Sequence, residues 1–181
     1  MTRSRRLTPQ TRASEQRFVA YVASSVDGRI SLSEKAPPDW TSEEDWKFFQ
    51  EELAKCDAFV IGRNTFEGLK GRARPNTFVF SRYPSATPQE KDVTFINPGI
   101  ADLKQLLSPF RRIGIVGGAR VYQSMLDQGL LNEIYVTIEP ILFGRGREMF
   151  EGGTKDHELK LLSVQTLNKK GTVLLHYEVL R

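Results

Sequence analysis

The sequence of 181 residues predicts an α/β fold whose mostly parallel sheet carries antiparallel strands at its C-terminal edge. Two observations predict this fold. Apolar strand-like runs alternate with helix-like segments up to about residue 127, and strand-like runs without intervening helices follow from residue 133. No internal repeat or low-complexity linker divides the chain, so we expect one domain over residues 18–181, a length that suits a single core.

The first part of the chain reads as β–α units. Residues 18–23 are continuously apolar, as in strands that are covered on both faces, and Asp27-Gly28 marks a tight turn after them. Further strands are expected at residues 57–62, 77–80, 93–96 and 112–116. Helices are expected at residues 64–69, 101–107 and 119–127.

Another helix is expected to begin after the hydroxyl residues 41–42. Hydroxyl side chains cap helix N-termini, and the acids at residues 43–45 complement the positive end of the helix dipole. Trp46, Phe49 and Leu53 recur at helical spacing, so we expect them to face the core.

The C-terminal third reads as β-hairpin structure. Long extended runs cover residues 133–142, 159–167 and 172–180, and residues 168–171 supply the last turn.

The net charge of +4 resides in the first 17 residues, which hold five arginines and one glutamate, so the remainder of the chain is neutral. We expect residues 1–17 to be a disordered basic tail, because they are almost free of apolar side chains. An organelle-targeting peptide is the alternative. A nucleic-acid-binding module would rest on this tail alone, and the neutral body argues against nucleic acid as a partner.

The composition argues against several classes of protein. Cys56 is the only cysteine and the two histidines, His157 and His176, are far apart, so no zinc site of ordinary spacing and no zinc deaminase is expected, and no metal. No run approaches the roughly 20 apolar residues of a membrane span. We therefore expect a cytoplasmic protein that does not associate with membranes.

The candidate chemistry lies where strands end, because ligands of such sheets bind at the carboxyl ends of the strands. Gly117-Gly118 follows one strand and opens a helix, so the backbone there can approach a phosphate closely. The alternative is a tight turn that only packs helix against sheet. This first candidate loop consists of Gly117, Gly118, Ala119, Arg120, Val121 and Tyr122.

Two further strand ends carry groups that suit anions. Gly62-Arg63-Asn64-Thr65 offers a guanidinium fork and a hydroxyl, and Ser81-Arg82 follows the next strand, although a solvated arginine and a helix-start threonine are equally ordinary. Three such ends together predict a dinucleotide. Arg63 and Arg82 favour NADPH over NADH, because a 2′-phosphate requires cations where NADH would require an acid.

These motifs, in this order and spacing, resemble the dihydrofolate-reductase family and, more closely, the reductase domain of the riboflavin-biosynthesis deaminase–reductase. The motifs are residues 25–31 (Ser-Val-Asp-Gly-Arg-Ile-Ser), 60–67, 81–82, 117–122, 130–134 and 140–144. The resemblance covers residues 18–181 and implies a dihydrofolate-reductase-like three-layer fold. The run at residues 68–75 departs from the riboflavin branch and is closer to the folate enzymes, whereas residues 25–31 are not those of a folate enzyme.

The resemblance implies roles for individual residues. Gly62, Arg63, Thr65, Ser81, Arg82 and residues 117–122 would contact NADPH, with a Gly-Gly peptide that is typically cis. Residues 27–32 would close over the nicotinamide, and Asp27, Arg29, Trp40, Phe49 and Thr137 would lie on the substrate side. Arg29 and Lys35 are candidates for binding a substrate phosphate.

Asp45 has two interpretations. The segment 39–49 resembles the substrate helix of dihydrofolate reductases, in which a carboxylate at this position holds the pterin ring and assists its protonation. Alternatively, Asp45 is only a capping residue at the third helical position after Ser42.

The resemblance implies an NADPH-dependent oxidoreductase that transfers hydride to a pteridine- or pyrimidine-type small molecule. The alternatives are dihydrofolate reductase activity, 5-amino-6-(5-phosphoribosylamino)uracil reductase activity, or a non-catalytic relative that only binds NADPH. The relatives are commonly homodimers that pair through C-terminal strands. The alternating run Ile134–Ile138 could serve such an interface or face the core.

Overall fold

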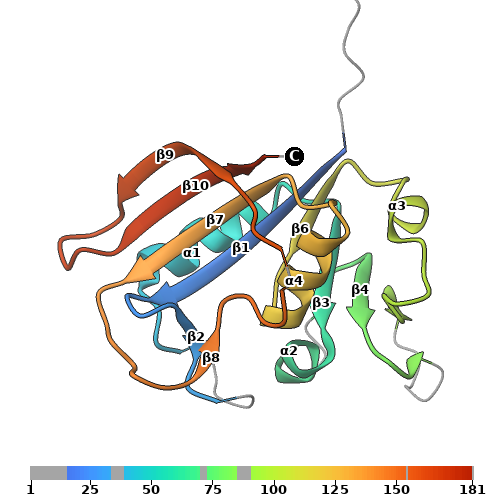
Figure 1. Cartoon of the computed structure of the whole chain (residues 1–181), viewed down its shortest axis with the longest axis horizontal. Helices are drawn as coiled ribbons and strands as arrows, with labels where there is room; N and C mark the ends of the chain where they lie inside the picture. Colours follow the sequence, from blue (N-terminus) through green and yellow to red (C-terminus); the bar gives the residue numbers. More distant parts are fainter. Residues whose placement is uncertain (1–15, 34–38, 70–72, 85–90, 154, 181) are drawn as a thin grey trace, which may run out of the picture.

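The computed structural model describes residues 16–33, 39–69, 73–84, 91–153 and 155–180. It contains an eight-stranded sheet in the order β5-β4-β3-β6-β1-β7-β10-β9 and a two-stranded sheet of β2 and β8 (Figure 1). The strands from β5 to β7 are parallel, whereas β10 and β9 are antiparallel to their neighbours. The predicted fold class is confirmed.

The elements follow the expected order closely. The strands are β1 (Arg17–Ser25), β2 (Arg29–Ser31), β3 (Ala58–Gly62), β4 (Thr77–Phe80), β5 (Val93–Ile96), β6 (Arg112–Ile115), β7 (Glu133–Glu139), β8 (Arg147–Glu148), β9 (Leu159–Thr166) and β10 (Val173–Val179). The helices are α1 (Glu43–Leu53), α2 (Arg63–Gly68), α3 (Leu103–Leu106) and α4 (Ala119–Asp127).

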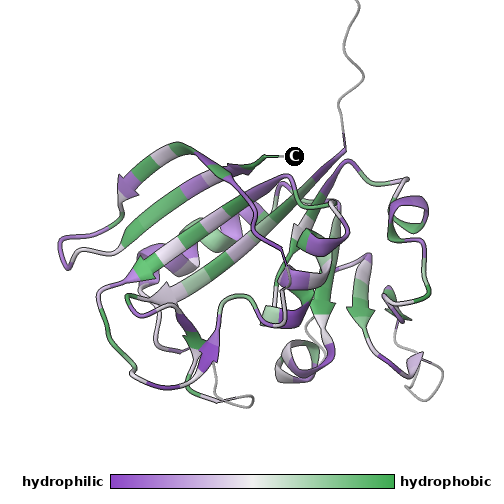
Figure 2. Cartoon of the chain, in the orientation of Figure 1, coloured by the Kyte–Doolittle hydropathy of each residue, from purple (hydrophilic) through white to green (hydrophobic). Residues whose placement is uncertain are grey.

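The sheet separates two layers of helices. Phe18, Ala20 and Val22 of β1 pack with residues of α3 and α4, whereas Val19 and Tyr21 pack with Leu53 of α1. A third cluster joins β3 and β4 to Phe66 of α2. Apolar residues concentrate along the buried strands (Figure 2). Because successive residues of a strand point to opposite faces, the continuous apolar run in β1 serves both layers.

The N-terminal boundary lies slightly before the predicted one. Residues 1–15 of the expected tail lie outside the described residues, but Arg17 already pairs with Arg112 in the sheet. The Gln16 side-chain amide donates hydrogen bonds to the carbonyls of Leu107 and Phe110, at 2.6 and 2.9 Å.

One prediction for α1 is wrong. Trp46 is 54% exposed, whereas Asp45, Glu52 and Leu53 are buried. The buried stripe therefore runs through positions 45, 52 and 53 with Phe49 half-buried beside it, and Trp46 lies about 100° away from Asp45 around the helix. Apolar spacing selected Trp46 because it could not anticipate that the helix buries a carboxylate.

The C-terminal strands differ from expectation in two details. β7 ends at Glu139, before Pro140, which cannot donate a ladder hydrogen bond. β7 lies between β1 and β10, and Ile134 and Val136 are buried in the core, so the run at 134–138 is not an edge. The short β2–β8 pair was not predicted, because two or three residues carry no periodic signal.

None of the helices in the described ranges is long and apolar enough to cross a membrane.

Candidate functional site

The three loops predicted to hold phosphates lie side by side. They follow β4, β3 and β6, which are consecutive parallel strands of the sheet. Gly62 at the end of β3 pairs with Phe80 at the end of β4, and its amide donates a 2.7 Å hydrogen bond to the carbonyl of Gly117. The carboxyl ends of these strands therefore bring the three loops to one edge.

The Gly117-Gly118 turn exposes backbone at the N-terminus of α4. The peptide between the two glycines is cis, and Gly117 has a φ of 109°, which disfavours any side chain. A Cβ on Gly118 would lie 3.7 Å from the Thr65 hydroxyl, so α2 also borders the turn. Gly118 caps α4 without a side-chain hydrogen bond, and the amides of Val121 and Tyr122 donate to its carbonyl, so the amides that this end of α4 offers to a ligand are those of Ala119 and Arg120.

The other residues of this loop contribute little side-chain chemistry. Ala119, Val121 and Tyr122 are buried in the core. The Tyr122 hydroxyl donates a 2.6 Å hydrogen bond to the carbonyl of Tyr21 in β1, and burial raises its pKa. Among these three residues, the backbone amide that could contact a phosphate is that of Ala119, because the amides of Val121 and Tyr122 donate to the carbonyl of Gly118.

Cationic side chains surround this edge. Arg82 is exposed and forms no side-chain ion pair within the described part of the chain. Arg63 pairs with Glu67 at 3.0 Å, where both side chains are largely exposed, and such a pair is weak. Ser81 is buried and its hydroxyl accepts a hydrogen bond from the amide of Tyr83.

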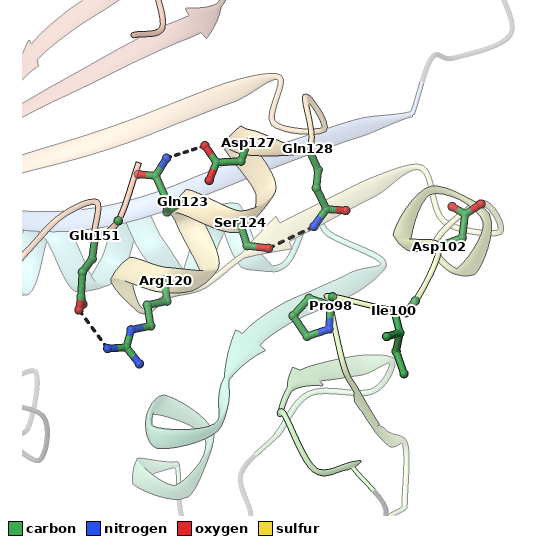
Figure 3. Close-up of a pocket in the computed structure, with 12 residues that line it drawn as sticks. Pro98, Ile100, Asp102, Arg120, Gln123, Ser124, Asp127, Gln128 and Glu151 are labelled. Carbon is green, nitrogen blue, oxygen red and sulfur yellow. Dashed lines mark hydrogen bonds and ion pairs between the residues drawn. The ribbon is translucent and has the colours of Figure 1, made fainter. Parts of the chain in front are cut away.

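An open groove of about 770 Å³ lies between α4 and the loop after β5 (Figure 3). Arg120 at one end pairs with Glu151 at 3.1 Å. Sequence reasoning missed the other lining residues, although the end of β5 is a fourth parallel strand end. They include Pro98, Ile100, Asp102, Gln123, Ser124 and Asp127.

A second cluster surrounds the N-terminus of α1. Asp45 and Thr137 are 7% and 2% exposed, and Thr137 comes from β7. Burial raises the pKa of the Asp45 carboxyl, the Thr137 and Thr41 hydroxyls beside it act in the opposite direction, and the charge of Glu139 raises it further. The structure thus places a buried carboxyl with raised pKa beside a strand end, in the part of the chain that the sequence singled out.

The cap at Ser42 uses the backbone of Asp45. The Ser42 hydroxyl accepts a hydrogen bond from the Asp45 amide at 3.3 Å. The Ser42 amide donates to Glu139 at 2.7 Å, so the Asp45 carboxylate takes no part in the cap. Capping therefore does not account for the side chain of Asp45. Glu139 was not anticipated, because only the fold brings it to this helix.

Three of the remaining substrate candidates, Phe49, Trp40 and Arg29, contact other side chains of the protein. Phe49 lies edge-on to Tyr21 at 6.3 Å between ring centres. Trp40 packs against Phe143 at 4.9 Å, and its indole nitrogen is buried without a partner in the described residues. Arg29 pairs with Glu148 at 3.1 Å. Lys35 lies outside the described residues.

Asp27 connects the turn after β1 to the loop at residues 143–144 through hydrogen bonds. Its carboxylate accepts hydrogen bonds from the Ser25 hydroxyl at 2.7 Å and from the amides of Phe143 and Gly144 at 3.0 and 2.8 Å. The bond from Ser25 and those from the two amides lower the pKa of Asp27 to about 2. Its acceptor positions are therefore largely occupied within the protein.

Within the described ranges, no group of three His, Cys, Asp or Glu residues could hold a metal ion.

Known proteins share this sequence and fold. The sequence matches the family described as RibD C-terminal domain over residues 18–77 and 72–173. The uncharacterised protein YwjB of Bacillus subtilis is 29% identical over 90% of this chain and 98% of its own. Dihydrofolate reductase of Candida albicans is 21% identical over 66% of this chain and 67% of its own.

Solved structures agree in fold. A putative riboflavin biosynthesis protein of Shewanella superposes with a TM-score of 0.73 at 21% identity, over 92% of this chain and all of its own. Dihydrofolate reductase of Enterococcus faecalis, solved with NADP(H), superposes with a TM-score of 0.63 at 23% identity, over 90% of this chain and 96% of its own. The three-layer fold is thus dihydrofolate-reductase-like, and the chain belongs to the RibD C-terminal domain family.

Proposed function

We propose that this protein is a cytoplasmic NADPH-dependent reductase that transfers hydride to a pyrimidine- or pteridine-type small molecule. The single observation that carries the proposal is the convergence of the loops after β4, β3 and β6 on one edge of the sheet. The family supports a reductase of the riboflavin-biosynthesis type.

The residues at this edge fit NADPH. Gly117 and Gly118 leave room for close approach to backbone amides, which suit a pyrophosphate. Arg63, Thr65, Ser81 and Arg82 would hold the remaining phosphate oxygens, and the groove beside α4 offers room for the adenosine half. When bound, NADPH would supply the hydride, and the protein would position the two rings and exclude water.

Asp45 is the group that we assign to proton delivery. A carboxyl whose pKa is raised by burial keeps its proton to a higher pH than an exposed aspartate does, and the Thr137 hydroxyl orients it. Trp40 and Phe49 would flank the substrate ring, whereas Asp27 and Arg29 would shape the loop that covers it. The Arg29 guanidinium could also contact a substrate phosphate.

Thermal unfolding with NADPH and with NADH tests the cofactor. We expect concentration-dependent stabilisation by NADPH that NADH does not match, because stabilisation grows with ligand concentration over Kd. Equal or absent stabilisation would contradict the proposal.

Turnover assays then separate the substrates. A structural neighbour from Thermotoga maritima is described as a deaminase/5-amino-6-(5-phosphoribosylamino)uracil reductase. Oxidation of NADPH with that uracil derivative but not with dihydrofolate would assign this chain to the pyrimidine branch, and the opposite result would make it a dihydrofolate reductase. NADPH binding without turnover of either substrate would support a non-catalytic relative.

We also propose a homodimer that pairs through β9. β9 is an edge of the eight-stranded sheet, and exposed apolar residues project from it: Leu159, Leu161, Leu162 and Val164, at 43–58% exposure. An open apolar edge of this kind invites pairing with a second strand. Light scattering after size-exclusion chromatography should give a dimer for the native chain and a monomer for Leu161→Lys combined with Val164→Lys. A native monomer would refute the dimer.

A further inference from the structure

Glu139 is a buried acid at the carboxyl end of β7, with 5% exposure. A buried carboxylate is costly unless hydrogen bonds compensate it. Here one carboxylate oxygen accepts a 2.7 Å hydrogen bond from the Ser42 backbone amide, and the other accepts a 2.6 Å hydrogen bond from the Thr172 hydroxyl. The N-terminus of α1 also favours negative charge at this place.

The bond to Ser42 replaces half of an ordinary capping box. In that motif, the hydroxyl of the capping residue accepts a hydrogen bond from the backbone amide of the third helical residue. The side chain of that third residue in turn accepts a hydrogen bond from the backbone amide of the capping residue. Ser42 and Asp45 occupy these two positions, and the first bond is present. The reciprocal bond comes instead from Glu139.

Glu139 is itself held from the far side. Thr172 is completely buried, and its hydroxyl also accepts a 2.9 Å hydrogen bond from the side-chain amide nitrogen of Asn168. The same Asn168 nitrogen lies 3.1 Å from Glu44 on α1. The β9–β10 turn therefore fixes Glu139 against the first turn of α1.

We infer that Glu139 is a positioning residue of the reductase site: by taking the Ser42 amide, it releases the Asp45 carboxyl from helix capping and leaves it beside Thr137. This inference deepens the proposed function and rests on it for the role of Asp45.

The charge of Glu139 has a second effect on Asp45. It opposes ionisation of Asp45, in the same direction as burial. Glu43 and Glu44 of α1 also lie near this end of the helix, but both side chains are exposed. Among the described groups facing Asp45 from other elements, Glu139 is the charged one, and Thr137 and Thr41 are neutral.

NMR of the full-length protein without cofactor or substrate tests this inference. Aspartate labelled with ¹³C at the carboxyl group reports the titration of Asp45, and Asp45→Asn identifies its resonance. The ¹H shift of the Ser42 amide reports its hydrogen bond to a carboxylate. Glu139→Gln keeps an acceptor for Ser42 but removes the charge, whereas Glu139→Ala removes both.

We expect the pH at the midpoint of the Asp45 titration to fall in Glu139→Gln, while the Ser42 amide stays hydrogen-bonded. In Glu139→Ala the midpoint should fall further, because the carboxylate swings to the free Ser42 amide, a bond that favours its charged form. Single-turnover hydride transfer should then fall on the order of 100-fold in Glu139→Ala, as for other misplaced catalytic groups, and much less in Glu139→Gln.

Glu43→Gln is the matched control, since it removes an exposed charge from the same helical turn. An Asp45 midpoint that is identical in the native chain and Glu139→Gln, or that shifts equally in Glu43→Gln, would overturn the inference. The NMR result does not depend on activity. If the native protein does not bind NADPH, the proposed function is refuted, but the NMR test of Glu139 is unaffected.

Discussion

The candidate nucleotide edge, formed by the loops after β4, β3 and β6, and the buried cluster around Asp45 are built in opposite ways. At the edge, the groups that we propose to face the ligand are backbone amides around Gly117 and Gly118, and three neighbouring side chains of that loop are buried in the core. In the Asp45 cluster, side chains from α1, β7 and the β9–β10 turn meet at two buried carboxyl groups, those of Asp45 and Glu139. The function of the edge should therefore depend on the backbone conformation that its glycines allow, and the function of the Asp45 cluster on individual oxygen atoms and on pH.

Asp45→Asn tests the Asp45 cluster and should give the largest effect. We expect hydride transfer to fall about 10²- to 10⁴-fold, the usual contribution of a general acid. Stability at pH 7 should rise, on the order of 1 kcal/mol, because ionising a buried acid of raised pKa costs stability. This gain should vanish below the ordinary aspartate pKa of about 3.9.

Turnover assays and thermal unfolding between pH 3 and 8 measure both effects. Asp156→Asn, at an exposed aspartate, is the control and should leave them unchanged. Unaltered turnover in Asp45→Asn would remove Asp45 from the chemistry.

Gly117→Ala tests the edge. An alanine there must adopt a φ of 109° and place its Cβ 3.0 Å from the Tyr122 hydroxyl. We expect a loss of about 1–3 kcal/mol of stability and loss of NADPH binding, measured by denaturant unfolding and by calorimetry. Gly129→Ala also has a positive φ but open space around it, so it should lose stability and keep NADPH affinity. Equal NADPH affinities of the two variants would argue against the edge as the nucleotide site.

Arg82→Ala, alone and combined with Arg63→Ala, measures how much the arginine side chains contribute to NADPH affinity at the edge. Each charged contact with phosphate should contribute about 1.5–3 kcal/mol, so we expect affinity for NADPH to fall roughly 10- to 100-fold per arginine. Affinity for NADH should change little, because NADH lacks the 2′-phosphate. Lys169→Ala removes an exposed cation elsewhere and should change neither. Equal losses for both nucleotides would place the arginines at the pyrophosphate instead.

Asp27→Asn should give the smallest effect. Because the pKa of Asp27 is lowered to about 2, the native carboxylate stabilises the fold above the ordinary aspartate value, and this contribution is lost as the pH falls toward 2. We therefore expect a small decrease of the melting temperature above about pH 4 that disappears in acid. A decrease that persists at pH 2 would show that the charge is not its cause.

Local patterns predicted most elements and the three neighbouring loops after β4, β3 and β6. A glycine pair after an apolar run already implies a strand, a turn and the start of α4, and parallel pairing then brings such turns together. The Asp45 cluster was predictable only in part. Glu139 is 94 residues beyond Asp45, and no spacing rule connects them, so its bond to Ser42 needed the fold. The wrong assignment of Trp46 has the same origin, because helical spacing does not reveal which carboxylate is buried.

The position of β7 between a parallel and an antiparallel neighbour constrains how this chain can change in length. Its odd-numbered residues include Thr137 and Glu139, and its even-numbered residues Ile134 and Val136 fill the core. A single residue inserted within β7 would turn the side chains that follow it to the opposite face of the sheet. Insertions should therefore accumulate among relatives beyond Glu139, in residues 140–158, where the chain can lengthen without rotating the acid away from α1.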